Sequence, residues 1–420
     1  MIKKYLFLTA LFLSSLSAQM VTLQECIDKT LDNHPDIKSF MLEVSKSEQA
    51  QKSARSAYLP HINFQAQYDV LHTYVLPQNG EFKTLDEQGW QAGVTLQQKI
   101  WDFSQTSSKI DAAQVDTQIA SLSVEETKAL MIYKVESLYE TALVQKKAIT
   151  VFQKDMQTKK ELHAQAHALV EQGIKTSSDE TRFLSAYYGA KDSLGTAEAS
   201  YEKALSSLWL YMGEKKLGLV ELQTNLLTDT NTMNLTPEQL SDDLLLNNTQ
   251  LKIYEQNIQK STLLHNSAKA SHYGSLDAVA SYTYFDTLNA YDASVVGVVL
   301  NIPLYTGGSL SAAEQTASIA TSSVKEFKNG KLLALQEELE ALLIDLKRYE
   351  NTIIAKKSQL EASVATKELI NARYTEGLVT YIEVLDATAL ELSSELGLLE
   401  AYFSRSMAQN RIKYLTGKQI

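Results

Sequence analysis

The 420-residue chain has few of the residues that interrupt helices: five prolines and sixteen glycines. Because proline lacks a backbone donor and glycine loses the most entropy on ordering, their scarcity favours long helices. Cys26 is the only cysteine, which excludes an intramolecular disulfide, and we expect it to be a small buried residue. The mean hydropathy of −0.19 argues against a bundle of membrane-spanning helices.

Positive charge is also in deficit, with 39 Lys and Arg against 50 Asp and Glu and a net charge of −11. This balance does not favour nucleic acid as a partner. Gly307 and Gly308 are not followed by a Gly-Lys-Ser/Thr phosphate-binding pattern, and no nucleophile elbow is present. His163 and His167 have metal-binding spacing but no third ligand beside them in the sequence. We therefore expect no enzyme activity, no cofactor and no metal site.

The N-terminus has the pattern of a secretory signal. Lys3 and Lys4 precede an apolar segment over residues 5–13, and small residues follow. The apolar segment is too short to span a membrane. Cleavage after Ser17 or Ala18 places the mature chain outside the cytoplasm.

Several long stretches of the sequence show helical spacing of apolar residues. Residues 22–58 predict a first helix, which Pro35 interrupts. Residues 104–171 hold neither proline nor glycine, which predicts one helix of roughly 100 Å. Gly173 ends this long helix, and a shorter helix follows over residues 177–212.

A period of two replaces the helical spacing in residues 62–70 and 90–97, which predicts a hairpin of two strands. Pro77, Asn79 and Gly80 mark the loop between them. The apolar set comprises Ile62, Phe64, Tyr68, Val70, Trp90, Val94 and Leu96. The alternating polar set comprises Asn63, Gln65, Gln67, Asp69, Gln91, Thr95 and Gln97. One face of the hairpin is therefore apolar and the other polar.

The same plan then repeats, which indicates internal duplication. A weakly patterned connector is followed by a helix over 237–273, strands over 276–285 and 293–302, a long helix over 309–376 and a last helix over 381–415. We divide the chain into a signal peptide (1–18), a first repeat (19–213), a connector in the equatorial region (214–236) and a second repeat (237–417). In each repeat two short helices placed end to end match one long helix in length.

Each long helix ends at a similar break. In the first repeat the break is Gly173 with Thr176, and in the second it is Gly377 with Thr380. Glycine at the end of one helix and threonine at the start of the next are typical of such turns. We interpret the two breaks as two tips at one end of a helical structure.

The four predicted strands, each of about 8 to 11 residues, suit a tilted crossing of a bilayer. A membrane sheet has to close, because open edges leave backbone groups unpaired in hydrocarbon. Four strands cannot close around a lumen, so several chains are required. The alternative is a soluble β-sandwich with one face of each sheet exposed to water.

The chain resembles the TolC-like outer-membrane efflux protein family. The resemblance is carried by the two-fold repeat, by Leu300-Asn-Ile-Pro-Leu-Tyr-Thr-Gly-Gly308, and by Tyr374-Thr-Glu-Gly377-Leu-Val-Thr380 before Glu383-Val-Leu-Asp386. It implies a mainly α fold with a small β part: a long α-helical coiled-coil barrel, or tunnel, plus a trimer-shared 12-stranded transmembrane β-barrel. It also implies a homotrimer in contact with outer-membrane lipid.

The resemblance implies the exit duct of a tripartite efflux or type I secretion system. The implied partners are a periplasmic adaptor (membrane fusion) protein and an inner-membrane transporter of the RND, ABC or MFS type. A stand-alone outer-membrane diffusion porin is the alternative function, and a soluble periplasmic coiled-coil adaptor is a further one.

The resemblance also assigns roles to residues of the tips. Glu383 and Asp386 match acidic residues that ring the periplasmic mouth, where repulsion among three copies is expected to raise some pKa values. Asp179 and Tyr374 match residues that hold the mouth shut. The adaptor-docking positions are Gly173, Ile174, Thr176, Gly377, Leu378 and Thr380. Val379 departs from the family because a basic residue is usual there, and Lys175 is a candidate substitute.

Overall fold

The computed structural model describes residues 19–78, 80–214, 220–223, 236–286 and 290–417. The predicted signal peptide lies outside these residues. The chain divides into two compact units, and each unit draws segments from both predicted repeats. Unit 1 comprises residues 1–35, 128–241 and 338–420, and unit 2 comprises 36–127 and 242–337. Within the described residues, none of the helices combines the length and the apolarity that a membrane crossing requires.

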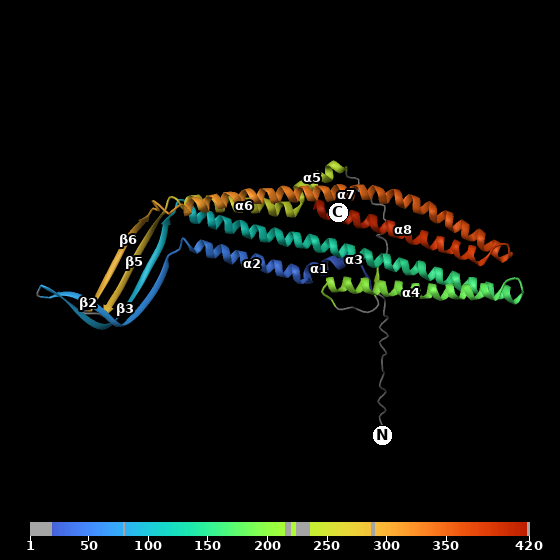
Figure 1. Cartoon of the computed structure of the whole chain (residues 1–420), viewed down its shortest axis with the longest axis horizontal. Helices are drawn as coiled ribbons and strands as arrows, with labels where there is room; N and C mark the ends of the chain where they lie inside the picture. The colour runs from blue at the N-terminus through green and yellow to red at the C-terminus, as the bar shows by residue number, and fades with distance from the viewer. Residues whose placement is uncertain (1–18, 79, 215–219, 224–235, 287–289, 418–420) are drawn as a thin grey trace, which may run out of the picture. The chain divides into compact units, whose positions relative to one another are not determined.

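Unit 2 contains a four-stranded antiparallel sheet with the order β2-β3-β5-β6 (Figure 1). Its strands are β2 (His61–Gln78), β3 (Glu81–Trp101), β5 (Ser275–Asp286) and β6 (Tyr291–Asn301). In the described part of the chain, β2 and β6 each pair on one side only. The sheet therefore has two open edges.

The predicted strand lengths are close for β5, which has 12 residues, and for β6, which has 11. They are wrong for the first hairpin, where β2 has 18 residues and β3 has 21. A register shift between Asp69 and His72 breaks the alternation that marked the strand in the sequence. Pro77 lies inside β2 rather than in the loop, and Gly80 adopts a positive φ of 84° at the turn. Asn79 lies outside the described residues.

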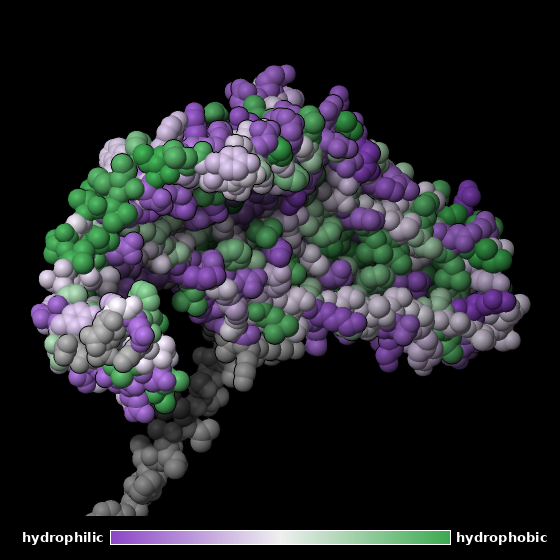
Figure 2. Space-filling model, turned by 60° about the vertical axis from the view of Figure 1, so that its left-hand side comes forward, coloured by the Kyte–Doolittle hydropathy of each residue, from purple (hydrophilic) through white to green (hydrophobic). Residues whose placement is uncertain are grey.

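The predicted two-faced character of the sheet is confirmed by its register. Ile62 lies opposite Leu96, and Phe64 lies opposite Val94. On the other face the Gln91 side chain donates to Gln67 at 3.1 Å. Phe64 is 71% exposed, which shows that the apolar face is not covered by this chain. Figure 2 shows hydrophobic residues gathered at the left of the view, where the strands come forward.

Four helices of unit 2 attach to the same end of the sheet. They are α2 (Pro35–Ser56), the start of α3 (Gln105–Glu171), α6 (Thr249–Ala270) and the start of α7 (Ser309–Thr375). Lys260 pairs with Asp116 at 2.7 Å, which joins α6 to α3. Lys328 pairs with Glu255 at 2.8 Å, which joins α7 to α6. The helix α6 therefore lies between α3 and α7.

The single helix predicted over residues 237–273 is wrong. The chain forms α5 (Pro237–Asn247) and α6, with Asn248 between them. The Asn248 side chain accepts from Leu251 N at 3.1 Å and so caps α6. The break at Pro35, between α1 (Leu23–Asn33) and α2, is its counterpart in the first repeat.

Unit 1 contains the rest of α3 and α7 together with α4 (Ser177–Tyr211) and α8 (Tyr381–Thr416). It also contains a two-stranded parallel sheet, β1 (Gln19–Val21) with β4 (Val220–Leu222), which was not predicted. The Tyr139 hydroxyl lies 3.0 Å from Val21 O and 3.2 Å from Gln223 O, and so fastens both strands to α3.

Cys26 lies in the core beside this small sheet and is fully buried, as predicted. Burial raises the pKa of its thiol to about 12. The core around it comprises Val21, Ile27, Val135, Tyr139, Ala142, Leu143, Ala204, Leu208, Trp209, Met212 and Leu222.

Candidate functional site

Each long helix ends at a glycine in the left-handed conformation, with φ of 73° at Gly173 and 78° at Gly377. The backbone amide of the residue after each glycine donates to a carbonyl in the last turn of the long helix. Ile174 N donates to Leu169 O at 2.9 Å, and Leu378 N donates to Arg373 O at 3.0 Å. These are the backbone bonds of a Schellman-type helix end. The sequence therefore builds two turns of the same kind, which we call the first tip (172–176) and the second tip (376–380).

The two tip threonines start the next helices differently. Thr380 forms a capping box with Glu383, whose carboxylate accepts from Thr380 N at 2.8 Å and from its hydroxyl at 2.9 Å. The equivalent Thr176 makes no side-chain cap bond. The hydrogen bonds from Thr380 lower the pKa of Glu383. Within one protomer this direction is opposite to the rise expected from repulsion in a ring of three.

A hydrophobic cluster joins the two tips. Tyr374 is fully buried at the end of α7, and its ring meets the ring of Phe183 of α4 edge-on at 5.6 Å. Val379 is 8% exposed and belongs to the same cluster, so it replaces a surface charge with core packing. The other buried members are Leu162, Ala166, Leu169 and Val384.

Lys175 bonds directly from the first tip to the second. Its ammonium donates to the backbone carbonyl of Val379 at 2.9 Å and lies 4.8 Å from the centroid of the Tyr374 ring. The ammonium is therefore held by a carbonyl oxygen and by an aromatic face. Burial, and secondarily the charge of Asp179, raises the pKa of the Tyr374 hydroxyl to about 12, so this residue stays neutral.

The predicted tip residues therefore separate into two groups. Tyr374 is inside the cluster, and Asp179 is half-buried close enough to affect its pKa. The remaining residues face solvent, with Ile174 at 53% exposure and Leu378 at 69%. Glu383 and Asp386 are also exposed.

An ion network farther from the tip was not predicted. Glu391 of α8 is 6% exposed and pairs with Lys367 of α7 and with Lys154 of α3, the latter at 3.0 Å. Burial alone raises the pKa of a carboxyl group, but the bonds from both lysines outweigh it and lower the pKa of Glu391. Three helices meet at this carboxylate, so no spacing within one helix could indicate it.

His163 and His167 have a neighbour that the sequence did not indicate. Glu180 of α4 approaches His167 Nδ1 at 2.9 Å and His163 Nε2 at 3.9 Å. Across the described residues, no three histidine, cysteine or acidic side chains are arranged to hold a metal ion. The cluster connects α3 to α4.

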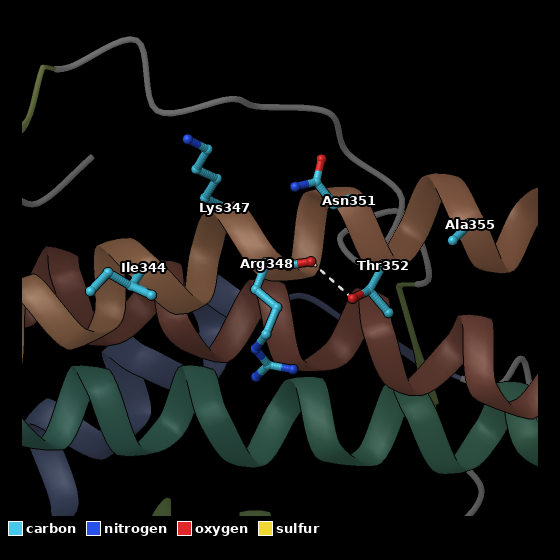
Figure 3. Close-up of a pocket in the computed structure, with 6 residues that line it drawn as sticks. All are labelled: Ile344, Lys347, Arg348, Asn351, Thr352 and Ala355. Atoms are coloured by element: carbon cyan, nitrogen blue, oxygen red, sulfur yellow. Dashed lines mark hydrogen bonds between the residues drawn. The ribbon is translucent and has the colours of Figure 1, made fainter.

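A shallow hollow of about 490 Å³ lies along α7 (Figure 3). The same helix supplies all six of its lining residues: Ile344, Lys347, Arg348, Asn351, Thr352 and Ala355. Lys347 and Asn351 point away from Arg348 in the view, so the polar groups do not converge. The one bond drawn runs from Thr352 Oγ1 to the backbone carbonyl of Arg348 within the helix.

Comparison with known proteins identifies the family of this chain. The model of the family described as outer membrane efflux protein matches residues 26–214 and 240–418. The outer membrane protein TolC of Vibrio cholerae is 23% identical over 416 residues, which cover 94% of this chain and 90% of that protein. The proteases secretion protein PrtF of Dickeya chrysanthemi is 22% identical and covers 75% of this chain and 71% of that protein.

Solved structures share the fold. CusC superposes with a TM-score of 0.84 at 15% identity, covering 94% of this chain and 92% of that one. The Campylobacter jejuni outer membrane channel CmeC gives 0.81 at 14% identity, covering 94% and 85%. These matches, together with the sheet and the paired tips, argue against a soluble periplasmic adaptor. The chain belongs to the outer membrane efflux protein family, and its place is the outer membrane.

Proposed function

We propose that three copies of this chain form the exit duct of a tripartite efflux or type I secretion system. Substrates pass without energy input from the periplasmic tips to the exterior. The observation that carries this proposal is the sheet, which has an exposed apolar face, two open edges and four helices attached at one end. Members of the family are channels, which fits a protein without enzymatic activity.

The open edges support closure by copies of the same chain. The β6 edge of one protomer is free to pair with the β2 edge of the next, and three copies then give a closed barrel of twelve strands. Because α2 leads into β2 and α7 follows β6, this pairing places α7 beside α2 of the neighbour. Exposed apolar residues on both helices fit such a contact, among them Met41 at 53% and Phe327 at 64% exposure.

The two matched segments support two repeats, which we place at 19–213 and 237–417 around the connector 214–236. In the trimer this gives six tips at one mouth. The exposed tip residues Ile174 and Leu378 are the surface we assign to a periplasmic adaptor. An inner-membrane transporter of the RND, ABC or MFS type supplies the energy. We assign Gly173, Thr176, Gly377 and Thr380 to shaping that surface.

For the gate we propose that Lys175, Tyr374 and Asp179 hold the two tips of one protomer together, with Lys175 in place of the charge that Val379 lacks. Glu383 and Asp386 then face the opening as a ring of six carboxylates that attracts cations. The capping box fixes the position of Glu383 at the start of α8.

The duct and the diffusion porin differ in their need for the tips. We expect Ile174→Glu with Leu378→Glu to abolish export in a strain that lacks the native gene, while the heat-resistant trimer persists in the outer membrane. Leu390→Glu, at 44% exposure on α8 away from the turns, is the matched control. Export that survives the tip substitutions favours the porin.

The proposed role of Glu383 and Asp386 can be tested by electrical recording. Glu383→Gln with Asp386→Asn is expected to weaken cation selectivity and the block by divalent cations in planar bilayers, because fixed negative charge is lost. Single-channel conductance in the presence of divalent cations is therefore expected to rise. Glutamine keeps the capping box, so the change isolates charge from helix stability. Glu368→Gln, an exposed acid on α7, is the control. If conductance and cation selectivity both stay unchanged, the two residues do not line the opening.

A further inference from the structure

Two glycines at equivalent places in the two hairpins differ in what lies above them. Gly93 of β3 and Gly297 of β6 are 204 residues apart, which is also the offset between the two tips. A Cβ on Gly93 would lie 2.6 Å from Thr283 Oγ1, so the Thr283 side chain of β5 occupies the space above this glycine. A Cβ on Gly297 would meet nothing within 4 Å. The space above Gly297 is therefore open in the single chain.

The backbone of Gly297 does not require glycine. This residue lies inside β6, and it is not among the glycines of the described residues that have a positive φ. Glycine in the interior of a strand weakens the strand, and it often marks a place where another group approaches closely. Within the described residues, no group of the same chain approaches Gly297 beyond its own neighbours. A group from outside the chain would account for the glycine.

The two hairpins have the same internal register, so their positions can be matched residue by residue. Ile62 pairs with Leu96 in the first hairpin, and Leu276 pairs with Leu300 in the second. The first strands of the two hairpins are therefore offset by 214 residues and the second strands by 204. These two offsets convert any position of β5 into a position of β2, and any position of β3 into a position of β6.

The sheet order makes the joint inside one chain equivalent to the joint between two copies. Inside the chain, β3 pairs with β5, and Gly93 lies opposite Thr283. In the proposed trimer, β6 is the counterpart of β3, and β2 of the next copy is the counterpart of β5. The offsets convert Gly93 into Gly297 and Thr283 into Asp69. Gly297 is therefore expected opposite Asp69 of the next copy.

We propose that the open space above Gly297 is a socket for the Asp69 side chain of the next copy, and that this contact fixes the register of the joint. This inference rests on the proposed trimer. Aspartate and threonine have side chains of similar size, so Asp69 fits where Thr283 fits at the equivalent place. Asp69 shares the polar face of the sheet with Gln67, whose side chain donates to its carboxylate at 2.7 Å. The socket is complete only when two copies meet.

The same register suits the apolar face of the sheet. It places Val298 opposite Tyr68 of the next copy and Leu300 opposite Ala66 of the next copy. Val298 and Leu300 are each 62% exposed in the single chain. Apolar side chains that lie directly opposite each other on neighbouring strands stabilise a sheet. The register that fills the socket therefore also continues the apolar face across the joint.

Shifted registers lose one of these two sets of contacts. A shift by one residue brings the polar face of one strand beside the apolar face of the other. A shift by two residues keeps the faces, but it places Asp69 of the next copy opposite Val295 or Val299. A valine fills the space that glycine leaves open. Among these registers, the one with Gly297 alone gives the Asp69 side chain an open space on the polar face.

Engineered cysteine pairs test the register. Val299 is 48% exposed on the polar side of β6, and the proposed register places it opposite Gln67 of the next copy. Opposite residues of an antiparallel pair lie within reach of a disulfide, whereas residues two positions away do not. We expect Val299→Cys with Gln67→Cys to give covalent dimers and trimers when membranes are oxidised. Val299→Cys with Gln65→Cys, on the same strand and face, is the matched control and is expected to give none.

The cross-links separate this inference from the proposed function. Cross-linking through Gln65 instead of Gln67 overturns the register, although it leaves the trimer in place. A heat-resistant trimer that gives neither cross-link also overturns the register. Absence of a heat-resistant trimer from the unaltered chain overturns the proposed trimer itself. The native Cys26 is buried and does not take part in the oxidation.

A larger side chain at Gly297 tests the socket. The added Cβ of Gly297→Val meets no atom of its own chain, and valine is favoured in strands, so the sheet of a single chain is expected to form. In the trimer the valine occupies the space for Asp69, so the yield of heat-resistant trimer is expected to fall about tenfold. Ala293→Val, on the same face of β6, is the matched control and is expected to leave the yield unchanged.

A second substitution shows whether Asp69 is the group that the valine excludes. Asp69→Ala in the Gly297→Val background shortens the side chain and is expected to restore most of the trimer yield. Equal yields from Gly297→Val and Ala293→Val overturn the socket. Failure of Asp69→Ala to restore the yield overturns it as well.

Discussion

At the residue scale, the two tip threonines give an internal comparison, because only Thr380 caps its helix. Thr380→Val is expected to destabilise the start of α8 by about 1 kcal/mol, since the cap bond is lost. Thr176→Val is expected to change stability little, since no side-chain bond exists there. Hydrogen exchange of the first turns of α4 and α8 measures both. Equal protection losses in the two variants contradict the difference in capping.

Gly274 and Gly173 differ in the space that each leaves for a Cβ atom. A Cβ on Gly274 would lie 2.0 Å from Asn301 O, and its φ is 88°, so Gly274→Ala combines a backbone clash with strain. A Cβ on Gly173 meets nothing within 4 Å, so Gly173→Ala bears only the cost of its positive φ, about 1 kcal/mol. We expect Gly274→Ala to prevent recovery of heat-resistant trimer from membranes and Gly173→Ala to permit it. Normal trimer from Gly274→Ala refutes this reading of the turn.

A residue's role could be predicted from the sequence when its partners lie close to it along the chain. Gly173, Gly377 and the Thr380 cap act within a few residues of themselves, so spacing was enough to predict them. Lys175 could be singled out only because the repeat aligned it with Val379. Glu391 could not be found, because its two lysines come from other helices.

At the element scale, two buried carboxylates link α8 to its neighbouring helices, and their pKa values shift in opposite directions. Glu391 is paired with lysines, whereas Glu140 of α3 is 6% exposed and accepts from Ser406 and Asn410 without a lysine bond. Burial outweighs those two bonds and raises the pKa of Glu140. The same helices therefore hold one acid that favours ionisation and one that resists it.

We expect Glu391→Gln to destabilise unit 1 by about 2 kcal/mol near neutral pH, because it leaves the partly buried Lys367 without its ion-pair partner. The folded state lowers the pKa of Glu391, so its contribution is present above the unfolded pKa and disappears as pH falls through the folded value. Thermal unfolding followed by circular dichroism from pH 7 to pH 3 measures the loss. In Glu391→Gln the acid-sensitive part is expected to be absent, and an unchanged profile counts against the network.

Glu140→Gln is expected to act in the opposite direction. The folded state raises the pKa of Glu140, so its ionised form opposes folding once pH exceeds the unfolded value. Removing the charge is expected to raise the melting temperature at neutral pH by about 2–4 °C for each kcal/mol gained. A lower melting temperature in the glutamine variant means that the ionised carboxylate is the stabilising form.

Element types were predictable and element ends less so. Pro35 marks the break between α1 and α2, but its counterpart at Asn248 has no proline, and a capping asparagine was missed as a helix start. The extension of β2 beyond Val70 was hidden by the irregularity after Asp69. The three-residue β1 and β4 are too short for any period to show, and they exist because they pair with each other.

At the scale of the whole molecule, the proposed trimer makes the open β6 edge a joint between copies of the chain. Val296 is 88% exposed in the middle of this strand. Val296→Pro removes a backbone donor from this edge strand and is expected to lower the yield of heat-resistant trimer. Val296→Thr keeps the donor and the β-branched shape and is the control. Trimer yield that is equal in both variants shows that β6 is not a joining edge.

The burial of Cys26 has a consequence for a protein that lives in an oxidising compartment. A lone accessible thiol there invites cross-links between molecules. A thiol with a pKa of about 12 in a sealed core supplies almost no thiolate, so it neither scrambles nor reacts. A cysteine introduced on either tip is therefore the single reactive thiol of the chain. In the proposed trimer, the distance between its three copies measures the width of the opening.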